Sequence, residues 1–252
     1  MLSSDVLEGD EAYEFTWVGK KASIVEANKP IRKTLRPCKD KSLHWDSTKN
    51  IYVEGDNLEV LKLLQESYLG QVDLIYIDPP YNTGKDFVYP DSFLMDDEAY
   101  NEGIGYFDED GNVNFARENN SATARYHSDW CSMIYSRLML ARNLLSEEGA
   151  IYISIDDNEY DNLRKICNEV FGAENYLTTF HIQVRYGEKS LNEEKIFKPM
   201  IEYVVAYAKN QKLFIPNQPT EEYGLEKFVF SISENESGEK FTVNGVESEI
   251  GF

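Results

Sequence analysis

The sequence has few cysteines, no long apolar run and a shortage of basic residues, and each absence excludes a class of protein. Its three cysteines, Cys38, Cys131 and Cys167, are far apart and form no close-spaced pattern with the three histidines. This argues for a reducing cytoplasm and against a structural zinc or other metal site. No apolar stretch approaches the length of a membrane span, and the first ten residues are acidic and lack a signal-peptide core. We therefore expect a cytoplasmic protein with no membrane partner.

Basic residues are outnumbered, because 25 lysines and arginines stand against 45 acidic residues and give a net charge of −20. An acidic surface repels phosphates, so this charge argues against tight DNA binding by the chain alone. The charge is uneven, however, and one N-terminal stretch is strongly basic. It contains Lys20, Lys21, Lys29, Arg32, Lys33, Arg36, Lys39 and Lys41 against only Glu26 and Asp40. Two interpretations stay open, a segment that lies along a phosphate backbone and a solvated extension.

The chain is organised around residues 72–84, an apolar run that stops at an acid, two prolines and a tyrosine. Residues 72–77 are largely apolar, β-branched and aromatic, which is typical of a strand buried on both faces of a parallel sheet. Neither Pro79 nor Pro80 can donate to a ladder, so strand pairing must end at Asp78. Ligands of open parallel sheets sit beyond the carboxyl ends of the strands, so we expect a site at this turn.

The residue types in the turn suit recognition of an exocyclic amine on a nucleobase. Asp78 offers a carboxylate, while the prolines stiffen the turn and leave carbonyls without competing amide hydrogens. Tyr81 adds a flat ring on which a base swung out of a duplex can stack. The alternative is an ordinary strand-ending turn in which Asp78 caps a following segment and Tyr81 belongs to the core. The four residues alone leave both interpretations open.

Asp-Pro-Pro-Tyr at a strand end resembles the signature of the amino-group DNA methyltransferases that use S-adenosylmethionine. The wider sequence, over roughly residues 13–210, is similar to the modification (Mod) subunit of type III restriction-modification systems. The segments that carry this resemblance are 50–64, 72–84, 91–93, 128–130, 137–138, 149–159 and 203–210.

The resemblance implies transfer of a methyl group from S-adenosylmethionine to adenine N6 in DNA. It implies three partners: double-stranded DNA, a second Mod subunit and the restriction (helicase-nuclease) subunit. The catalytic residues it implies are Asp78, Pro79, Pro80 and Tyr81. In this mechanism the Asp78 carboxylate and the Pro79 carbonyl accept the hydrogens of the amine, and Tyr81 holds the base at reacting distance.

Two further groups of residues complete the predicted site. The resemblance implies that Asp56, Asn57 and Asp78 bind the cofactor, although Asp56 and Glu59 also have the spacing of a helix cap and its partner. A polar loop follows the turn, and we expect its side chains to contact DNA. These side chains are Asn82, Thr83 and Lys85, and a solvent-exposed lysine is the simpler role for the last of them.

Periodicity predicts an α/β fold with a mostly parallel sheet and an antiparallel edge hairpin, and the resemblance implies that this sheet is Rossmann-like. Residues 51–53 are expected to form a strand, followed by a helix and a right-handed crossover into a central strand at 72–77. A second helix is predicted over 128–145, opened by Ser128 and closed by Gly149. The next predicted strand is 150–155, after which Asp156 and Asp157 cap another helix. The hairpin is predicted from residues 176–185 and 201–208.

The chain divides into three predicted segments. Residues 1–48 are an N-terminal extension, 49–210 the methyltransferase domain with a loop insertion near 95–125, and 211–252 the start of a target-recognition region with a turn at Asn244-Gly245. In the resembling family a Phe-x-Gly-x-Gly loop of the cofactor site follows the recognition region, and the sequence ends at Phe252 without it. We therefore expect an incomplete fold, the N-terminal part of a Mod subunit. The alternative to an active enzyme is a catalytically silent fragment that binds DNA or assembles with other subunits.

Overall fold

The computed structural model describes residues 13–83, 122–184 and 199–217, together with the backbone of three short strands nearer the C-terminus. The chain forms two compact units, Met1–Phe214 and Ile215–Phe252. Within the described residues no helix combines the length and the apolar character needed to cross a bilayer.

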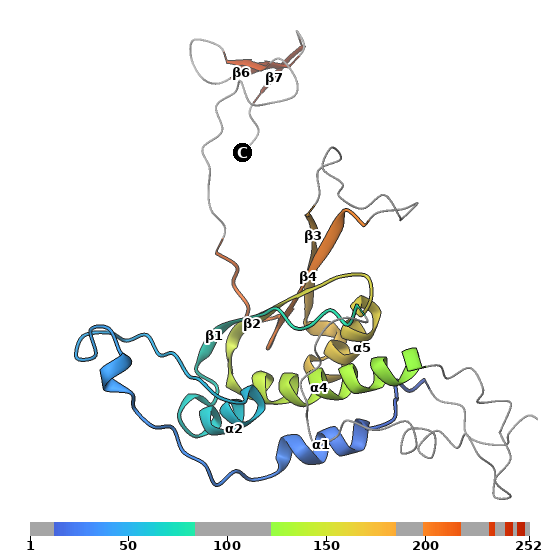
Figure 1. The fold of residues 1–252 in the computed structure, drawn as a ribbon. Helices are drawn as coiled ribbons and strands as arrows, with labels where there is room; N and C mark the ends of the chain where they lie inside the picture. Colours follow the sequence, from blue (N-terminus) through green and yellow to red (C-terminus); the bar gives the residue numbers. More distant parts are fainter. Residues whose placement is uncertain are drawn as a thin grey trace, which may run out of the picture. The chain divides into compact units, whose positions relative to one another are not determined.

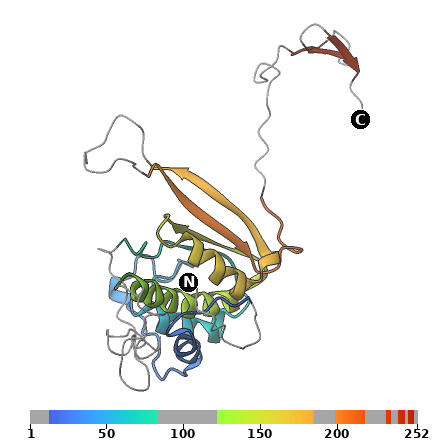
Figure 2. The same cartoon turned by 90° about the vertical axis from the view of Figure 1, so that its right-hand side faces the viewer.

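The described residues of the first unit form one sheet and several helices. Its elements, in chain order, are α1 (Lys20–Asn28), η1 (Lys39–Lys41), α2 (Asn57–Tyr68), β1 (Val72–Ile77), α4 (Ala122–Leu144), β2 (Leu145–Ile155), α5 (Tyr160–Phe171), η3 (Ala173–Asn175), β3 (Tyr176–Gln183) and β4 (Ile201–Ala208). The strand order is β1-β2-β4-β3. The helices gather on one side of this sheet, and β3 and β4 extend past them as a two-stranded ribbon (Figure 1, Figure 2).

The sheet is mixed, so the expectation of a mostly parallel sheet is wrong for the described strands. Only β1 and β2 pair in parallel, whereas β2 with β4 and β4 with β3 pair antiparallel. The predicted edge hairpin is confirmed as β3 and β4. The predicted strand at 51–53 does not form, because these residues find no pairing partner and Ile51 and Tyr52 are exposed. The predicted crossover is therefore wrong, and β1 lies at an edge of this sheet instead of its centre.

Strand β1 is covered on one face only. Ile75 and Ile77 pack against the core, but Leu74 is 62% exposed and Tyr76 is 58% exposed. Burial on both faces, as predicted, is therefore wrong. The core lies between the sheet and helices α4 and α5, and its largest fully buried side chains are Trp130, Met133, Ile134, Leu138, Leu145, Ile151, Ile153, Ile155, Leu163, Ile166, Phe171 and Tyr207.

Two predicted helix boundaries are also wrong, for reasons visible in the packing. Helix α4 begins at Ala122, so Ser128 lies inside it and is buried instead of capping it. Gly149 does not end this helix but lies within β2, where a β-carbon would stand 2.8 Å from the carbonyl oxygen of Val72. The glycine is needed because β1 approaches β2 closely at this point.

The acidic pair after β2 does not cap α5, so its predicted capping role is wrong. Asp156 accepts a hydrogen bond from the backbone N–H of Asn158 at 2.9 Å, and Asp157 accepts one from the Tyr203 hydroxyl at 2.7 Å. The residue at the N-cap position of α5 is Glu159, whose side chain makes no capping bond.

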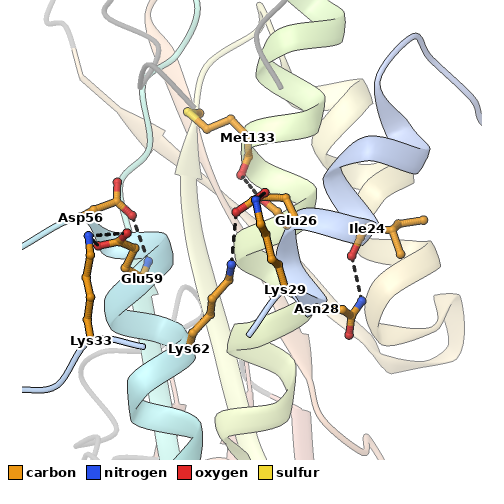
Figure 3. Close-up of polar contacts among 10 residues, drawn as sticks. Ile24, Glu26, Asn28, Lys29, Lys33, Asp56, Glu59, Lys62 and Met133 are labelled. Atoms are coloured by element: carbon orange, nitrogen blue, oxygen red, sulfur yellow. Dashed lines mark hydrogen bonds and ion pairs between the residues drawn. The ribbon is translucent and has the colours of Figure 1, made fainter. Parts of the chain in front are cut away.

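The N-terminal segment packs on the body of the unit, which its charge pattern does not indicate. The indole of Trp17 donates to Ser132 of α4 at 2.9 Å, and Phe15 and Ile24 pack against the core. Several of its charges are already paired. Figure 3 shows Lys33 bound to Glu59, and Lys62 of α2 bound to Glu26 of α1 at 3.4 Å. Two further basic residues of the segment form ion pairs, Lys20 with Glu169 and Lys29 with Glu26.

The second unit contains a small antiparallel sheet of β5 (Ile232–Glu234), β6 (Lys240–Val243) and β7 (Val246–Glu249). Val243 pairs with Val246, so β6 and β7 form an antiparallel pair on either side of the predicted turn. The predicted turn residues, Asn244 and Gly245, lie outside the described residues, as does most of the predicted insertion near 95–125.

Candidate active site

The predicted turn follows β1 directly and faces the end of the sheet. Strand β1 ends at Ile77, and Asp78 is exposed at its carboxyl end. Residues 79–82 are half-buried, and no regular element begins before the described segment ends at Thr83. Asp78 therefore caps no helix in the described residues, and its carboxylate is accessible to a ligand.

Tyr81 connects the turn both to the core and to Asp78. Its ring packs against the hydrophobic core, as the alternative interpretation of the turn expected. Burial, and then the neighbouring Asp78 carboxylate, raise the pKa of Tyr81 well above its ordinary value. The hydroxyl therefore stays protonated beside Asp78. Both oxygens of the Asp78 carboxylate can accept hydrogen bonds, so they are suited to a ligand amine.

Helix α4 holds the turn at Pro80. The indole N–H of Trp130, a fully buried residue, donates to the Pro80 carbonyl at 2.6 Å. Since Pro80 has no N–H and its carbonyl is already bound, its contribution is to fix the backbone. This geometry is compatible with the Pro79 carbonyl as the second acceptor for a ligand.

Asn82 turns inward instead of facing solvent. Its backbone has φ of 59°, a left-handed conformation that asparagine tolerates better than most residues. Its side-chain amide donates to the Tyr126 carbonyl at 3.2 Å and to Glu159. The DNA contact predicted for this residue stays a prediction, but its amide N–H groups are engaged within the protein. Thr83 is exposed, and Lys85 lies outside the described residues.

Glu159 is the functional candidate that the sequence did not reveal. It is 1% exposed, and three side chains donate to its carboxylate. Asn82 and His127 bind Oε1, the latter at 2.6 Å, and Asn162 binds Oε2 at 2.7 Å. Burial raises the pKa of Glu159, and the bonds from Asn162, Asn82 and His127 act in the opposite direction. Its only sequence signal is an acid beyond a strand end, which is equally typical of a cap.

The predicted cofactor residues Asp56 and Asn57 begin α2. Asp56 accepts a hydrogen bond from the Glu59 N–H at 2.9 Å, so the predicted cap is confirmed, and its carboxylate remains exposed (Figure 3). Asn57 accepts a hydrogen bond from Nε of Arg137 in α4 at 2.7 Å. Both predicted side chains are therefore held by defined contacts at the first turn of a helix.

Helix α4 contacts both the turn after β1 and the start of α2, where the predicted cofactor residues lie. Trp130 binds the turn after β1, and Arg137 binds the start of α2. These two residues are seven positions apart, which is about 10 Å along an α-helix. The exposed carboxylates of Asp56 and Asp78 thus belong to two loops anchored on α4. Such acceptors fit the chemistry of S-adenosylmethionine, which has a cationic sulfonium and hydroxyl and amine donors.

The described residues form an α/β unit with an exposed acid and a half-buried aromatic ring at the end of a strand, an arrangement compatible with a planar, amine-bearing ligand. Residues 72–242 match the DNA methylase family of N6/N4 methyltransferases, and the chain belongs to this family.

The chain is also similar to three type III restriction-modification enzyme Mod subunits, which confirms the resemblance. It is 38% identical over 214 residues to the EcoPI Mod subunit of Escherichia phage P1, covering 83% of this chain and 32% of that protein. It is 33% identical over 250 residues to the EcoP15I Mod subunit of Escherichia coli, covering 97% and 37%. For the StyLTI Mod subunit of Salmonella typhimurium the identity is 35% over 235 residues, covering 90% and 34%. The chain spans about a third of the length of these relatives.

Proposed function

We propose that this chain carries the base-binding part of a type III modification methyltransferase, which methylates adenine N6 in double-stranded DNA. The observation that carries the proposal is the turn after β1, where an exposed Asp78 lies beside a half-buried Tyr81. Family membership and the similarity to Mod subunits support the choice of DNA as substrate.

The residues of the turn would act through position and electrostatics. The Asp78 carboxylate and the Pro79 carbonyl accept hydrogen bonds from the two N–H groups of the adenine amine. These bonds turn the nitrogen lone pair out of conjugation with the ring and towards the methyl donor. Tyr81 restricts the base to a stacked position at reacting distance.

We assign the cofactor role to S-adenosylmethionine, which supplies the methyl group when bound. Asp56, Asn57 and Asp78 would hold it, on a sheet that we propose to be Rossmann-like. The cytoplasm is the proposed location. A second Mod subunit and a restriction subunit are the proposed protein partners, in line with the relatives' names.

The test is calorimetric titration of the chain with S-adenosylmethionine, followed by methyl transfer to duplex DNA and detection of N6-methyladenine by mass spectrometry. Asp56→Ala and Asp78→Ala should weaken cofactor binding, and Asp78→Ala should abolish transfer. Asp73→Ala is the matched control, because it removes an exposed carboxylate from the opposite end of β1.

Cofactor binding and N6-methyladenine that both depend on Asp78 support the proposal. No binding by the folded chain, or a product that survives Asp78→Ala, would contradict it. The first of these results would favour the catalytically silent fragment that binds DNA or assembles with subunits.

A further inference from the structure

We infer that Glu159 is a positioning residue for the turn that carries Asp78 and Tyr81. Through Oε1 it holds Asn82 in its left-handed conformation and so fixes how the chain leaves the turn. The consequence for activity rests on the proposed function, whereas the position of the turn is measured independently of it.

The turn is held at two points that flank Tyr81. On one side the Trp130 indole binds the Pro80 carbonyl, and on the other Glu159 binds the side chain of Asn82. Tyr81 is the residue between these two contacts, and Asp78 lies three positions before it in the same turn. Loss of either contact therefore frees the backbone on one side of the ring that we assign to base stacking.

The carboxylate of Glu159 is suited to this role because it brings together side chains that are distant in the sequence. His127 of α4 binds the same oxygen as Asn82, so the exit of the turn is tied to the helix that also holds Pro80. Bonds to an ionised acceptor are shorter and stronger than those to a neutral one. Asn162 binds the other oxygen and contacts Glu159 from α5, away from Asn82.

Stability alone does not explain a carboxylate at this place. A buried ionised group is no better for stability than a neutral one of similar shape, because its removal from water is costly. Glu159→Gln preserves the shape and one acceptor oxygen, so we expect it to leave the fold intact. Glu159→Gln removes the charge that strengthens the bond to Asn82, so we expect the backbone of the turn to be held less tightly.

The indole N–H of Trp130 reports on the turn, since it binds Pro80 directly. Its proton resonance and its exchange with solvent can be followed by NMR, with Trp130→Phe to assign the signal. The indole of Trp17, bound to Ser132, is an internal control in every sample. The variants are Glu159→Gln, Asn82→Gly and Asn162→Ala.

Glycine at position 82 accepts the left-handed backbone but has no side chain to reach Glu159. We expect Glu159→Gln and Asn82→Gly to shift the Trp130 signal upfield and speed its exchange about tenfold or more. Asn162→Ala removes a bond to the same carboxylate but none to the turn, so it should leave this signal in place. The Trp17 signal should stay unchanged in all three variants.

An unchanged Trp130 signal in folded Glu159→Gln and Asn82→Gly protein would overturn the inference, and so would an equal change in Asn162→Ala. In the methylation assay we expect Glu159→Gln to lower kcat about 10- to 100-fold with little change in KM for S-adenosylmethionine. A parent chain that binds and methylates nothing would contradict the proposed function, but the Trp130 signals would still decide the role of Glu159.

Discussion

Replacement of Trp130 by phenylalanine tests how strongly α4 holds the candidate active site. Trp130 is 0% exposed, and its indole N–H makes the 2.6 Å bond to the Pro80 carbonyl. Phenylalanine keeps one aromatic ring but removes this donor and the atoms around it. The lost hydrogen bond accounts for about 1 kcal/mol. The lost burial and the void left in the core add about 1–3 kcal/mol, so we expect a total destabilisation of about 2–4 kcal/mol.

The measurement is urea unfolding followed by far-UV circular dichroism, which does not depend on tryptophan fluorescence. The midpoint should fall while the slope stays constant, because the surface exposed on unfolding is unchanged. Trp45→Phe is the control, since Trp45 is exposed and its replacement should change the free energy of unfolding by less than about 0.5 kcal/mol. A cost below about 1 kcal/mol for Trp130→Phe would refute the reasoning, because neither the bond nor the packing would then be significant.

Three other substitutions test separate contacts. Asp56→Ala should destabilise the chain by about 1 kcal/mol in urea unfolding, and Asp56→Asn much less, because asparagine can still cap α2. Gly149→Ala should cost about 1–3 kcal/mol in the same assay, since its β-carbon would stand 2.8 Å from a backbone oxygen of β1. For Glu159→Gln the prediction concerns pH. Burial raises the pKa of Glu159, so its stabilising contribution is present below the ordinary value of about 4.3 and is lost as the pH rises through the folded pKa. The variant should therefore gain stability relative to the parent chain as the pH rises, and a constant difference between them would contradict this.

The turn itself could be predicted because its residue types act locally. Two prolines end strand pairing wherever they occur, so the end of β1 at Ile77 follows from Pro79 and Pro80. The cap at Asp56 is equally local, because it involves only the first turn of its own helix. The β3–β4 hairpin was predictable for the same reason, since its two strands are close in the chain and of compatible pattern.

The pairing of the sheet could not be predicted in this way, because it depends on partners distant in the chain. Residues 51–53 have a good strand composition, but they remain unpaired and Tyr52 is 88% exposed. Leu74 and Tyr76 likewise have the apolar character of a buried strand, although β1 is an edge strand with one open face in the described sheet. Composition expresses what a strand could bury and does not specify what lies against it.

The same limit explains why Glu159 could not be predicted as a site residue, whereas Asn82, which it holds, could. Asn82 adjoins a recognisable motif, but its partner is 77 positions away, in a segment whose acids the sequence predicts to cap a helix.

Because one face of β1 is open, the position of the turn that follows this strand depends on contacts from its other side. Two hydrogen bonds hold the turn from the side of α4 and Glu159, one through Trp130 and one through Asn82. A base bound on Tyr81 would therefore be aligned by two contacts on one side, and loosening either should affect alignment before it affects the fold.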